Sequence, residues 1–483
     1  MRFFKDYELT RDYLKCEFKD CSDFLMRELV ISGRRVLLCA MDGLVDGVYL
    51  SESVLEPLLC CSIKNDNAYE FLTGLQTRVI AAPEMSQPET FEDGEFFLMS
   101  GFVLLYADGG EKALVFGVQG WNRRSTDEPT NEAMVKGAKE CFVESINDNK
   151  ALLRKRLKSP HLKLKQINLG EAAKTPVVIA YMDDRACADD VKKVENALKN
   201  ADFNTLSDYG EAAEFLAKKK RSFFSTSGNT ERPDVLASKL KEGRIAVMVD
   251  GSPFVIYTPY LFSDNFSSLD DYNNPPFYAS FIRLLKIFAF CISTFLPALY
   301  VAIGSFHQEM IPTLLLYIVA TSEESTPFSL LFEAIIIHLL YEIMREAGLR
   351  LPKTVGHAVS IIGAIVIGEA MVTAGLIGEP MLVVVALTAI ASYVVYPLYE
   401  SVAVLRLVFI VIAGVGGVYA LVLSACALFI NICSLSSLGV PYTAPITPLT
   451  RASLGDTVIR RDWRYLANRK VRLKNMRGVN KNG

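Results

Sequence analysis

The chain has 483 residues with a formal net charge of −3, and 51% of them are hydrophobic. That length allows two or three domains. Its ten cysteines follow no regular spacing, which argues against a disulfide framework and a zinc site and favours reduced, mostly buried thiols. The first residues contain no uninterrupted apolar run of the kind that a secretory signal requires, so we expect the N-terminal part to stay cytosolic.

Residues 1–170 are predicted to form a first cytosolic α/β unit. An apolar run at 35–41 is closed by Asp42-Gly43, which is typical of a buried strand that ends in a turn. Asp108-Gly109-Gly110 separates two further apolar runs and predicts a β-hairpin, because glycine supplies the positive φ of such a turn. We expect the hairpin strands at 101–107 and 112–118, and short helices at 51–59 and 68–75.

Residues 171–280 are predicted to form a second cytosolic α/β unit and a linker. Pro233 opens a helix at a first-turn position, where its missing N–H costs little. We expect strands at 177–181 and 244–249 and helices at 188–198 and 211–219, an alternation typical of a small sheet covered by helices. Asp-Gly follows strands at 42–43, 108–109 and 250–251, either as simple turns or as the trace of a distant duplication.

The sequence shows no motif of a catalytic or cofactor site. It has neither a Gly-x-Gly-x-x-Gly dinucleotide motif, nor a phosphate-binding loop, nor a Gly-x-Ser-x-Gly nucleophile motif. We therefore predict that the protein is not an enzyme and binds no cofactor or metal.

Residues 281–440 are predicted to form an α-helical polytopic membrane domain. Each of four apolar runs, at 284–306, 355–376, 381–396 and 407–430, is long enough or nearly long enough to cross a hydrocarbon core of ~30 Å. The tail, residues 441–483, is basic, and from 451 onward it holds ten basic and two acidic side chains. We expect it on the cytoplasmic side beside anionic lipid headgroups. A nucleic-acid-binding arm is the alternative, and we predict no nucleic-acid partner.

Ionisable residues interrupt the apolar stretch 328–347. Glu333, His338, Glu342 and Arg345 lie in it, and the last three share one helix face because they are four and three residues apart. Such groups are costly in lipid, so this helix is expected to line an aqueous path or to pack against a polar partner. An amphipathic helix at the membrane surface is the alternative. All four residues are candidates for an ion path or for gating.

Three more candidates for the ion path or gating lie elsewhere in the membrane half. Glu309 comes just before a segment, 310–320, that is too short to cross alone, and Pro312 lies within this segment. It is either a re-entrant or broken helix or an extracytoplasmic loop with an interfacial turn. Glu369 lies among small residues in the middle of an apolar run, as an ion-path residue or as a neutral acid hydrogen-bonded between helices.

The number of crossings is predicted to be even, because the N-terminal part and the tail are both expected in the cytoplasm. The four apolar runs satisfy this condition. If 328–347 also crosses, a sixth crossing is needed, for which 310–322 is the candidate. Arg350 and Lys353 favour a cytoplasmic loop after 328–347 and hence six crossings. We expect four to six.

Several motifs together resemble those of GerA-type spore germination proteins, over roughly residues 100–445. In the soluble half these are Glu128-Pro129-Thr130 with Glu132, Leu153-Arg154-Lys155-Arg156, Glu231-Arg232-Pro233 and Asp250-Gly251-Ser252. In the membrane half they include the runs 306–313 and 345–352, Tyr399-Glu400 and 439–442. The chain departs from the family pattern at Lys136-Gly137-Ala138, where Arg-Gly-Pro is usual, and at His357 and Glu369, where glutamine is usual.

The resemblance implies an A-type subunit of a germinant receptor in the inner membrane of a bacterial spore. Its soluble part and tail would face the spore core. Such a subunit would form homo-oligomers and couple nutrient sensing to ion release, together with a transporter-like B-type subunit and a C-type lipoprotein. A paralogous SpoVA-associated membrane subunit, a secondary transporter and an anchored scaffold are the alternatives, although the run 306–313 is more similar to the receptor branch.

Overall fold

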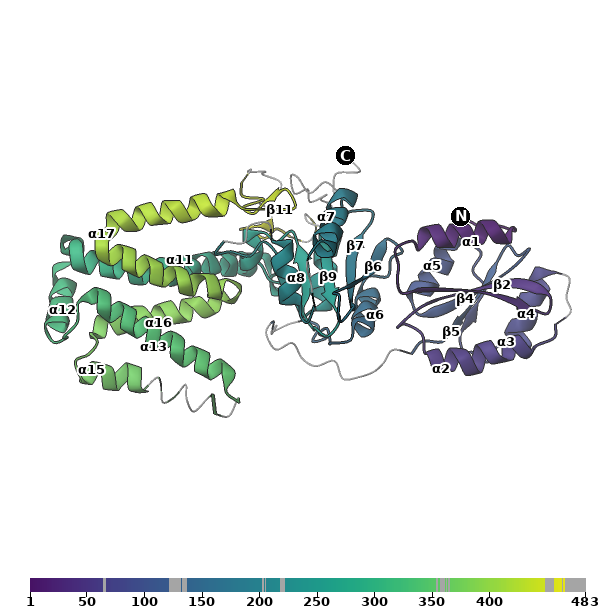
Figure 1. The fold of residues 1–483 in the computed structure, drawn as a ribbon, viewed down its shortest axis with the longest axis horizontal. Coiled ribbons are helices and arrows are strands. Elements are labelled where there is room, and N and C mark those ends of the chain that lie inside the picture. The colour runs from purple at the N-terminus through teal and green to yellow at the C-terminus, as the bar shows by residue number, and fades with distance from the viewer. Residues whose placement is uncertain are drawn as a thin grey trace.

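Two antiparallel sheets and a set of long helices follow one another along the chain, and they give it an elongated shape (Figure 1). This computed structural model describes residues 1–63, 67–120, 132, 137–201, 204, 206–217, 222–352, 355–356, 361, 363, 365–447, 456–462 and 464. Glu128, Pro129 and Thr130 of the predicted soluble motif lie outside the described residues.

The first unit is built on a sheet that is apolar on both faces. Side chains alternate along β2 (Arg34–Met41), so that Val36 and Leu38 face one layer of helices and Leu37 and Cys39 face the other. The two layers are α2 (Gly47–Leu50), η1 (Ser51–Leu55), α3 (Glu56–Cys60) and α4 (Ala68–Arg78) on one face, and α1 (Tyr7–Glu17) and α5 (Phe91–Met99) on the other. The antiparallel strand order is β1 (Phe24–Ile31), β2, β4 (Phe102–Ala107), β5 (Ala113–Gly117) and β3 (Met85–Ser86).

The second unit has the same construction plan. Its antiparallel sheet has the order β6 (Leu162–Leu169), β7 (Thr175–Met182), β9 (Ile245–Val249), β10 (Val255–Thr258) and β8 (Gly228–Thr230). One face is covered by α6 (Ile146–Arg156) and α9 (Pro233–Lys241), and the other by α7 (Ala188–Lys199) and α8 (Tyr209–Leu216). Within the described residues the predicted strands and helices of both units are confirmed, including the hairpin of β4 with β5 and the start of α9 at Pro233. The helix predicted at 211–219 is α8, which ends at Leu216.

The two units share one topology. In each, the chain runs through a helix, two strands, further helices, one short strand, a helix and a final hairpin, and both sheets join their strands in the corresponding order. Asp108-Gly109 and Asp250-Gly251 then fall in equivalent hairpins. Of the two interpretations of these Asp-Gly pairs, the shared topology favours duplication.

The boundary between the units differs from the predicted one at residue 170. β6 pairs along its whole length with β7, from Leu162 with Met182 to Leu169 with Thr175, and α6 packs in the core of the second sheet. Because β6 and α6 pack with the second sheet, they belong to the second unit, and the boundary lies between β5 and α6. Contacts across it include a parallel bridge between Cys21 and Leu164.

The helical part begins with α11 (Pro276–Phe306), after η2 (Phe262–Phe266) and α10 (Asp270–Asn273). η3 (Gln308–Met310) and α12 (Thr313–Glu324) follow at the far end of the bundle, where α12 lies across the long helices instead of entering between them (Figure 1). α13 (Leu330–Arg350) returns. After residues 353–364, of which few are described, η4 (Val366–Ala370) and α15 (Met371–Thr373) precede α16 (Glu379–Val394) and η5 (Tyr396–Leu398).

The last helix, α17 (Tyr399–Ser434), folds back on itself at Gly417, whose φ is 63°. Both of its ends lie beside the second α/β unit, because Ser401 donates to the carbonyl oxygen of Phe223 and the hydroxyl of Ser437 lies 3.0 Å from that of Thr258. β11 (Ser436–Ser437) and β12 (Val440–Pro441) follow. The run 407–430, predicted as one crossing, is thus divided between two arms, 399–416 and 418–434.

Within the described residues, two helices are long and apolar enough to cross a membrane, Pro276–Phe306 and Tyr396–Ser434. α16 is apolar but has only 16 residues. The helix predicted at 328–347 is α13, and the segment predicted at 310–322 is α12.

Candidate functional site

A cluster of charged side chains in the helical part surrounds Glu342 on α13. Its carboxylate accepts hydrogen bonds from Arg345 Nε at 3.0 Å, from the Tyr399 hydroxyl at 2.9 and 3.0 Å, and from Arg406 Nη2 at 3.0 Å. Glu342 and Arg345 meet because they are three residues apart on one helix. Tyr399 and Arg406 are seven residues apart, two turns of α17, and so share the face of α17 that meets α13. We name these four residues the Glu342 cluster.

The Glu342 cluster is largely shielded from solvent. The Arg345 guanidinium lies 4.1 Å from the centroid of the Tyr399 ring, within the range of a cation–π contact. The side chain of Arg406 is 1% exposed. Buried charges are tolerated where they are paired and hydrogen-bonded, and here one carboxylate serves three donors.

The charges of the Glu342 cluster do not balance. Two guanidinium groups share one carboxylate, although Arg345 also lies 3.6 Å from Glu346. Arg406 Nη1 is buried and has no hydrogen-bond partner within the described part of the chain. An unpaired buried donor is costly, so this nitrogen has the capacity for one more acceptor.

His338 lies one turn before Glu342 on the same helix and is 1% exposed. Its Nδ1 is 2.8 Å from the carbonyl oxygen of Ala334, an atom that can only accept, so the proton of the neutral ring is on Nδ1. Nε2 is then an acceptor, and it too is buried without a partner among the described residues. In the described part of the chain, Arg406 thus has an unused donor and His338 an unused acceptor.

Glu333 is on the same helix but belongs to a different contact. Its side chain is buried and accepts a hydrogen bond of 2.6 Å from the backbone N–H of Gly378. Gly378 is the N-cap residue of α16, so the carboxylate lies at the positive end of that helix dipole. Glu333 therefore fixes the start of α16 against α13 rather than joining the Glu342 cluster.

The remaining predicted ion-path residues are not brought together. Glu309, in η3, and Pro312, the N-cap of α12, are exposed at the far end of the bundle. Glu369 is exposed on the π-helical turn η4. None of the three contacts Glu342, so of the seven predicted residues only Glu342 and Arg345 meet in the cluster.

Glu231 and Arg232, from the family motif of the soluble half, contact Glu132 in the segment between the two units. Glu231 Oε1 accepts from the backbone N–H of Glu132 at 2.9 Å, and Thr230 donates to the Glu132 carboxylate at 2.6 Å. Burial raises the pKa of Glu132 to about 7, and the neighbouring Glu231 acts in the same direction. Arg232 completes this contact through Nη1, which donates to the Glu132 carbonyl oxygen at 3.4 Å.

The other residues of the soluble motif end helices and loops. Pro233 is in the first turn of α9. Asp250 accepts from the N–H of Ile146 at the start of α6, at 3.1 Å, and the Ser252 hydroxyl donates to Asp208, the N-cap of α8, at 2.6 Å. The contacts of Asp250 and Ser252 do not include Glu132. The motif residues therefore position separate backbone segments and do not form one site.

Two buried ion pairs connect different parts of the chain, and their residues were not among the predicted site residues. Arg154 binds Asp23 through two hydrogen bonds of 3.0 Å, and both side chains are almost completely buried between the two units. Arg283, in α11, binds Asp271 at 2.7 Å and donates to the carbonyl oxygen of Asp456 at 2.6 Å. These contacts tie the second unit, the first long helix and the C-terminal segment together.

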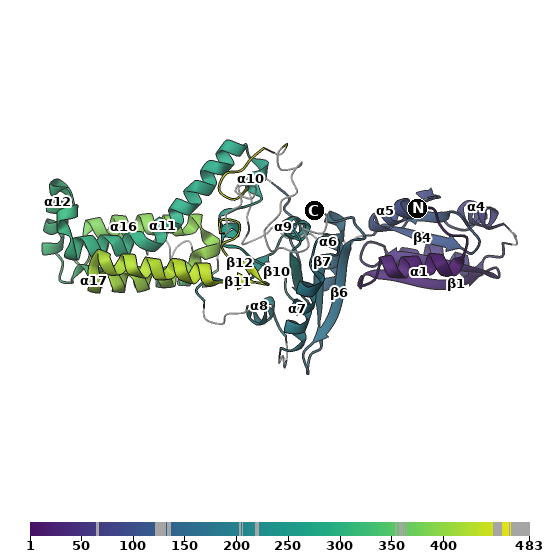
Figure 2. The ribbon, with the colours of Figure 1, turned by 90° about the horizontal axis from the view of Figure 1, so that it is seen from above.

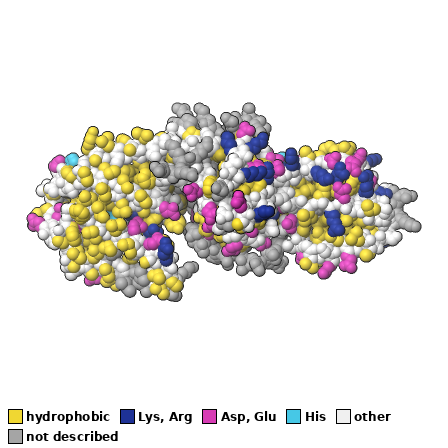
Figure 3. All heavy atoms as spheres, viewed as in Figure 1, with side chains coloured by type: hydrophobic (Ala, Val, Ile, Leu, Met, Phe, Trp, Pro, Cys, Tyr) yellow, Lys and Arg dark blue, Asp and Glu magenta, His cyan; other side chains and the backbone are white. Residues whose placement is uncertain are grey.

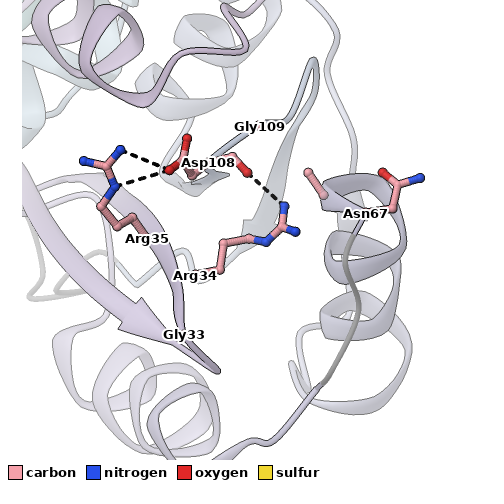
Figure 4. Close-up of a pocket in the computed structure, with 7 residues that line it drawn as sticks. Gly33, Arg34, Arg35, Asn67, Asp108 and Gly109 are labelled. Carbon is pink, nitrogen blue, oxygen red and sulfur yellow. Dashed lines mark hydrogen bonds and ion pairs between the residues drawn. The ribbon is translucent and has the colours of Figure 1, made fainter.

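A surface hollow of about 790 Å³ lies on the first unit, between the β1–β2 turn, the β4–β5 hairpin and the start of α4 (Figure 4). Its charged groups bind one another: Arg35 donates to Asp108 Oδ2 at 3.2 and 3.1 Å, and Arg34 Nη1 donates to the Asp108 carbonyl at 2.9 Å. The hollow belongs to the first unit, and the Glu342 cluster belongs to the helical part at the other end of the molecule (Figure 1).

Two α/β units attached to long apolar helices with an internal charge cluster indicate a membrane-associated protein. The model of the family "Bacillus/Clostridium GerA spore germination protein" matches residues 12–471. The chain belongs to this GerA family, as its motifs suggested.

Known relatives extend over most of the chain. Spore germination protein KA of Bacillus subtilis (strain 168) is 36% identical over 457 residues, which cover 93% of this chain and 83% of that protein. Uncharacterized membrane protein YfkQ of the same organism is 34% identical over 453 residues, covering 93% and 88%. The crystal structure of the N-terminal domain of the A subunit of the Bacillus megaterium spore germinant receptor GerK3 has 27% identity, covers 54% of this chain and 98% of that one, and gives a TM-score of 0.43.

Proposed function

We propose that the chain is the A-type subunit of a germinant receptor in the spore inner membrane and that it couples nutrient sensing to ion release. Membership of the GerA family and the name of the relative KA, a spore germination protein, support a role in germination. Its partners would be a transporter-like B-type subunit, a C-type lipoprotein and further copies of itself.

The path of the helices supports six membrane crossings. The passes would be α11, α13, the predicted run 355–376, which lies partly outside the described residues, α16 and the two arms of α17, so that the chain would leave and return on the side of the α/β units. Hydrophobic side chains cover most of the face of the bundle seen in Figure 3, whereas charged side chains are frequent on the α/β units. Such a surface is stable in contact with lipid.

The Glu342 cluster is the observation that carries the proposed coupling. It connects α13 to α17 at the end of the bundle near the second α/β unit, where Ser401 of α17 contacts Phe223. Among the described residues, its member Arg406 keeps one unpaired donor, and His338, one helical turn before Glu342, keeps one unpaired acceptor. A partner that moves when nutrient binds can shift these helices between two arrangements only if some contact differs between the arrangements. We propose that the contact of the Glu342 carboxylate with Arg406 is the one that differs.

The test is cation release from spores after addition of nutrient. Glu342→Gln removes the charge that three donors share, and Arg345→Leu removes one donor; both should slow release at an unchanged amount of protein. Arg350→Gln is the matched control, because Arg350 is on the same helix, is 79% exposed and pairs with Glu346 rather than with Glu342. Normal release in the first two variants would remove the Glu342 cluster from the mechanism.

A further inference from the structure

The beginning of α11 presents an exposed apolar stripe. Phe277, Phe281, Leu284 and Phe288 are 92%, 58%, 52% and 67% exposed, and their spacing of four, three and four residues places them on one helix face. In Figure 2 this part of α11, next to α10, stands away from the other long helices. Exposed aromatic residues in such a row are not expected to face water.

Polar side chains beside the stripe and opposite it fix the same turns to the protein. Arg283 is fully buried and binds Asp271, and the Ser280 hydroxyl accepts from the N–H of Arg460 at 3.0 Å. Rotating the helix to bury the stripe would break these contacts and would leave the Arg283 guanidinium unpaired. The stripe therefore points away from the second unit as a consequence of how α11 is anchored.

The length of α11 indicates where the stripe lies relative to the hydrocarbon core of the membrane. Its 31 residues span about 46 Å at 1.5 Å per residue, whereas the hydrocarbon core is about 30 Å thick. About ten residues therefore remain outside the core. They lie at the N-terminal end, because Phe306 is followed directly by η3 and α12 at the far end of the bundle.

We propose that the first turns of α11, from Phe277 to Phe288, lie in the interface between lipid headgroups and acyl chains and bind a lipid surface through this stripe. A helix with aromatic and leucine side chains on one face and fixed polar groups on the other matches the elements that lie in this layer. The stripe also leads directly into the apolar surface of α11 that follows. This inference rests on the proposed membrane insertion and adds to it the element that sets the depth of the bundle.

The experiment measures the depth of single tryptophans with brominated lipids. In the full chain reconstituted into vesicles of phosphatidylcholine and phosphatidylglycerol, Trp121 and Trp463 are replaced by phenylalanine, and one tryptophan is introduced at a time. Phe281→Trp reports on the stripe, and Leu387→Trp, at an exposed position in the middle of α16, is the control for the hydrocarbon core. If the Phe281 variant does not fold, Phe277→Trp replaces it.

We expect lipids brominated near the headgroup to quench the Phe281→Trp emission about twofold more than lipids brominated near the chain ends, and the reverse for Leu387→Trp. Quenching of Leu387→Trp with none of Phe281→Trp would overturn the interfacial assignment and leave membrane insertion intact; a blue-shifted emission would then identify a protein contact, such as a second copy. Absence of quenching at both positions would contradict the proposed insertion itself.

Discussion

We predict that substitutions within the Glu342 cluster differ in how much they lower the free energy of unfolding. Glu342→Gln leaves Arg406 buried with no charged partner, since Glu342 is the acceptor of its Nη2. Arg406→Leu leaves Glu342 with two partners, Arg345 and Tyr399, and also removes the unpaired Nη1. The loss of the shared carboxylate should therefore cost more than the loss of either guanidinium.

Known magnitudes give this asymmetry a scale. Removing one member of a buried ion pair costs about 3–5 kcal/mol. Because the Glu342 side chain is 21% exposed, we expect about 3 kcal/mol for Glu342→Gln. We expect about 1 kcal/mol for Arg406→Leu, since its packing loss is partly offset by removal of an unsatisfied donor. The double variant should cost about 1–2 kcal/mol less than the sum of the two.

Thermal unfolding of the purified full chain in detergent measures the cycle. For a helical part of this size, about 3 kcal/mol corresponds to a fall in Tm of about 6–12 °C. Arg350→Gln, a change in an exposed pair with Glu346, should shift Tm by about 1–2 °C at most. Equal costs for Glu342→Gln and Arg406→Leu, or strict additivity in the double variant, would refute the shared-carboxylate reasoning.

Three further predictions concern other parts of the chain. Arg154→Met should destabilise the contact between the α/β units by about 3 kcal/mol, because Asp23 stays buried without a partner, and proteolysis between the units should accelerate. Raising the pH from 4.5 to 7 should lower the free energy of unfolding of the second unit by up to about 3 kcal/mol, since the unfolded chain loses the Glu132 proton first; urea unfolding of Glu132→Gln should lack this fall. Gly417→Ala should lower Tm, because φ is 63° there and the new Cβ would lie 3.0 Å from His307 Cε1.

Matched variants separate these effects from general damage. Arg156→Met changes a neighbouring arginine whose partner, Glu140, is at the surface, and it should leave proteolysis unchanged. Gly210→Ala places a Cβ in open space within α8 and should not lower Tm. Wild-type proteolysis in Arg154→Met, an unchanged pH profile in Glu132→Gln or an unchanged Tm in Gly417→Ala would each contradict its prediction.

Local sequence patterns predicted the elements well and their association less well. The apolar run at 35–41 and Pro233 at a helix start are signals within a few residues, and both elements form as expected. The placement of β6 in the second sheet depends on its pairing with β7, and the fold at Gly417 depends on how α17 meets the end of α11. Neither is encoded in a short window of sequence.

The candidate site shows the same division. The spacing of Glu342 and Arg345 predicted that they meet, because three residues along a helix fix their neighbourhood. Tyr399 and Arg406 reach Glu342 only through the packing of α17 on α13. Arg406 did carry a signal, as a single charge at the edge of a long apolar run, where an ionised group needs a partner. Glu369 carried the same signal and is exposed, because burial depends on the facing helix.

The most direct test of the account is which side of the membrane the two ends of the bundle face. A chain that keeps only Cys16, exposed on α1, and a cysteine-free chain with Ser325→Cys, exposed just after α12, would each be treated with a membrane-impermeant thiol reagent in intact cells. We predict that Ser325→Cys is labelled at once and that Cys16 is labelled only after permeabilisation. Labelling of both in intact cells, or of Cys16 alone, would contradict six crossings with the α/β units inside.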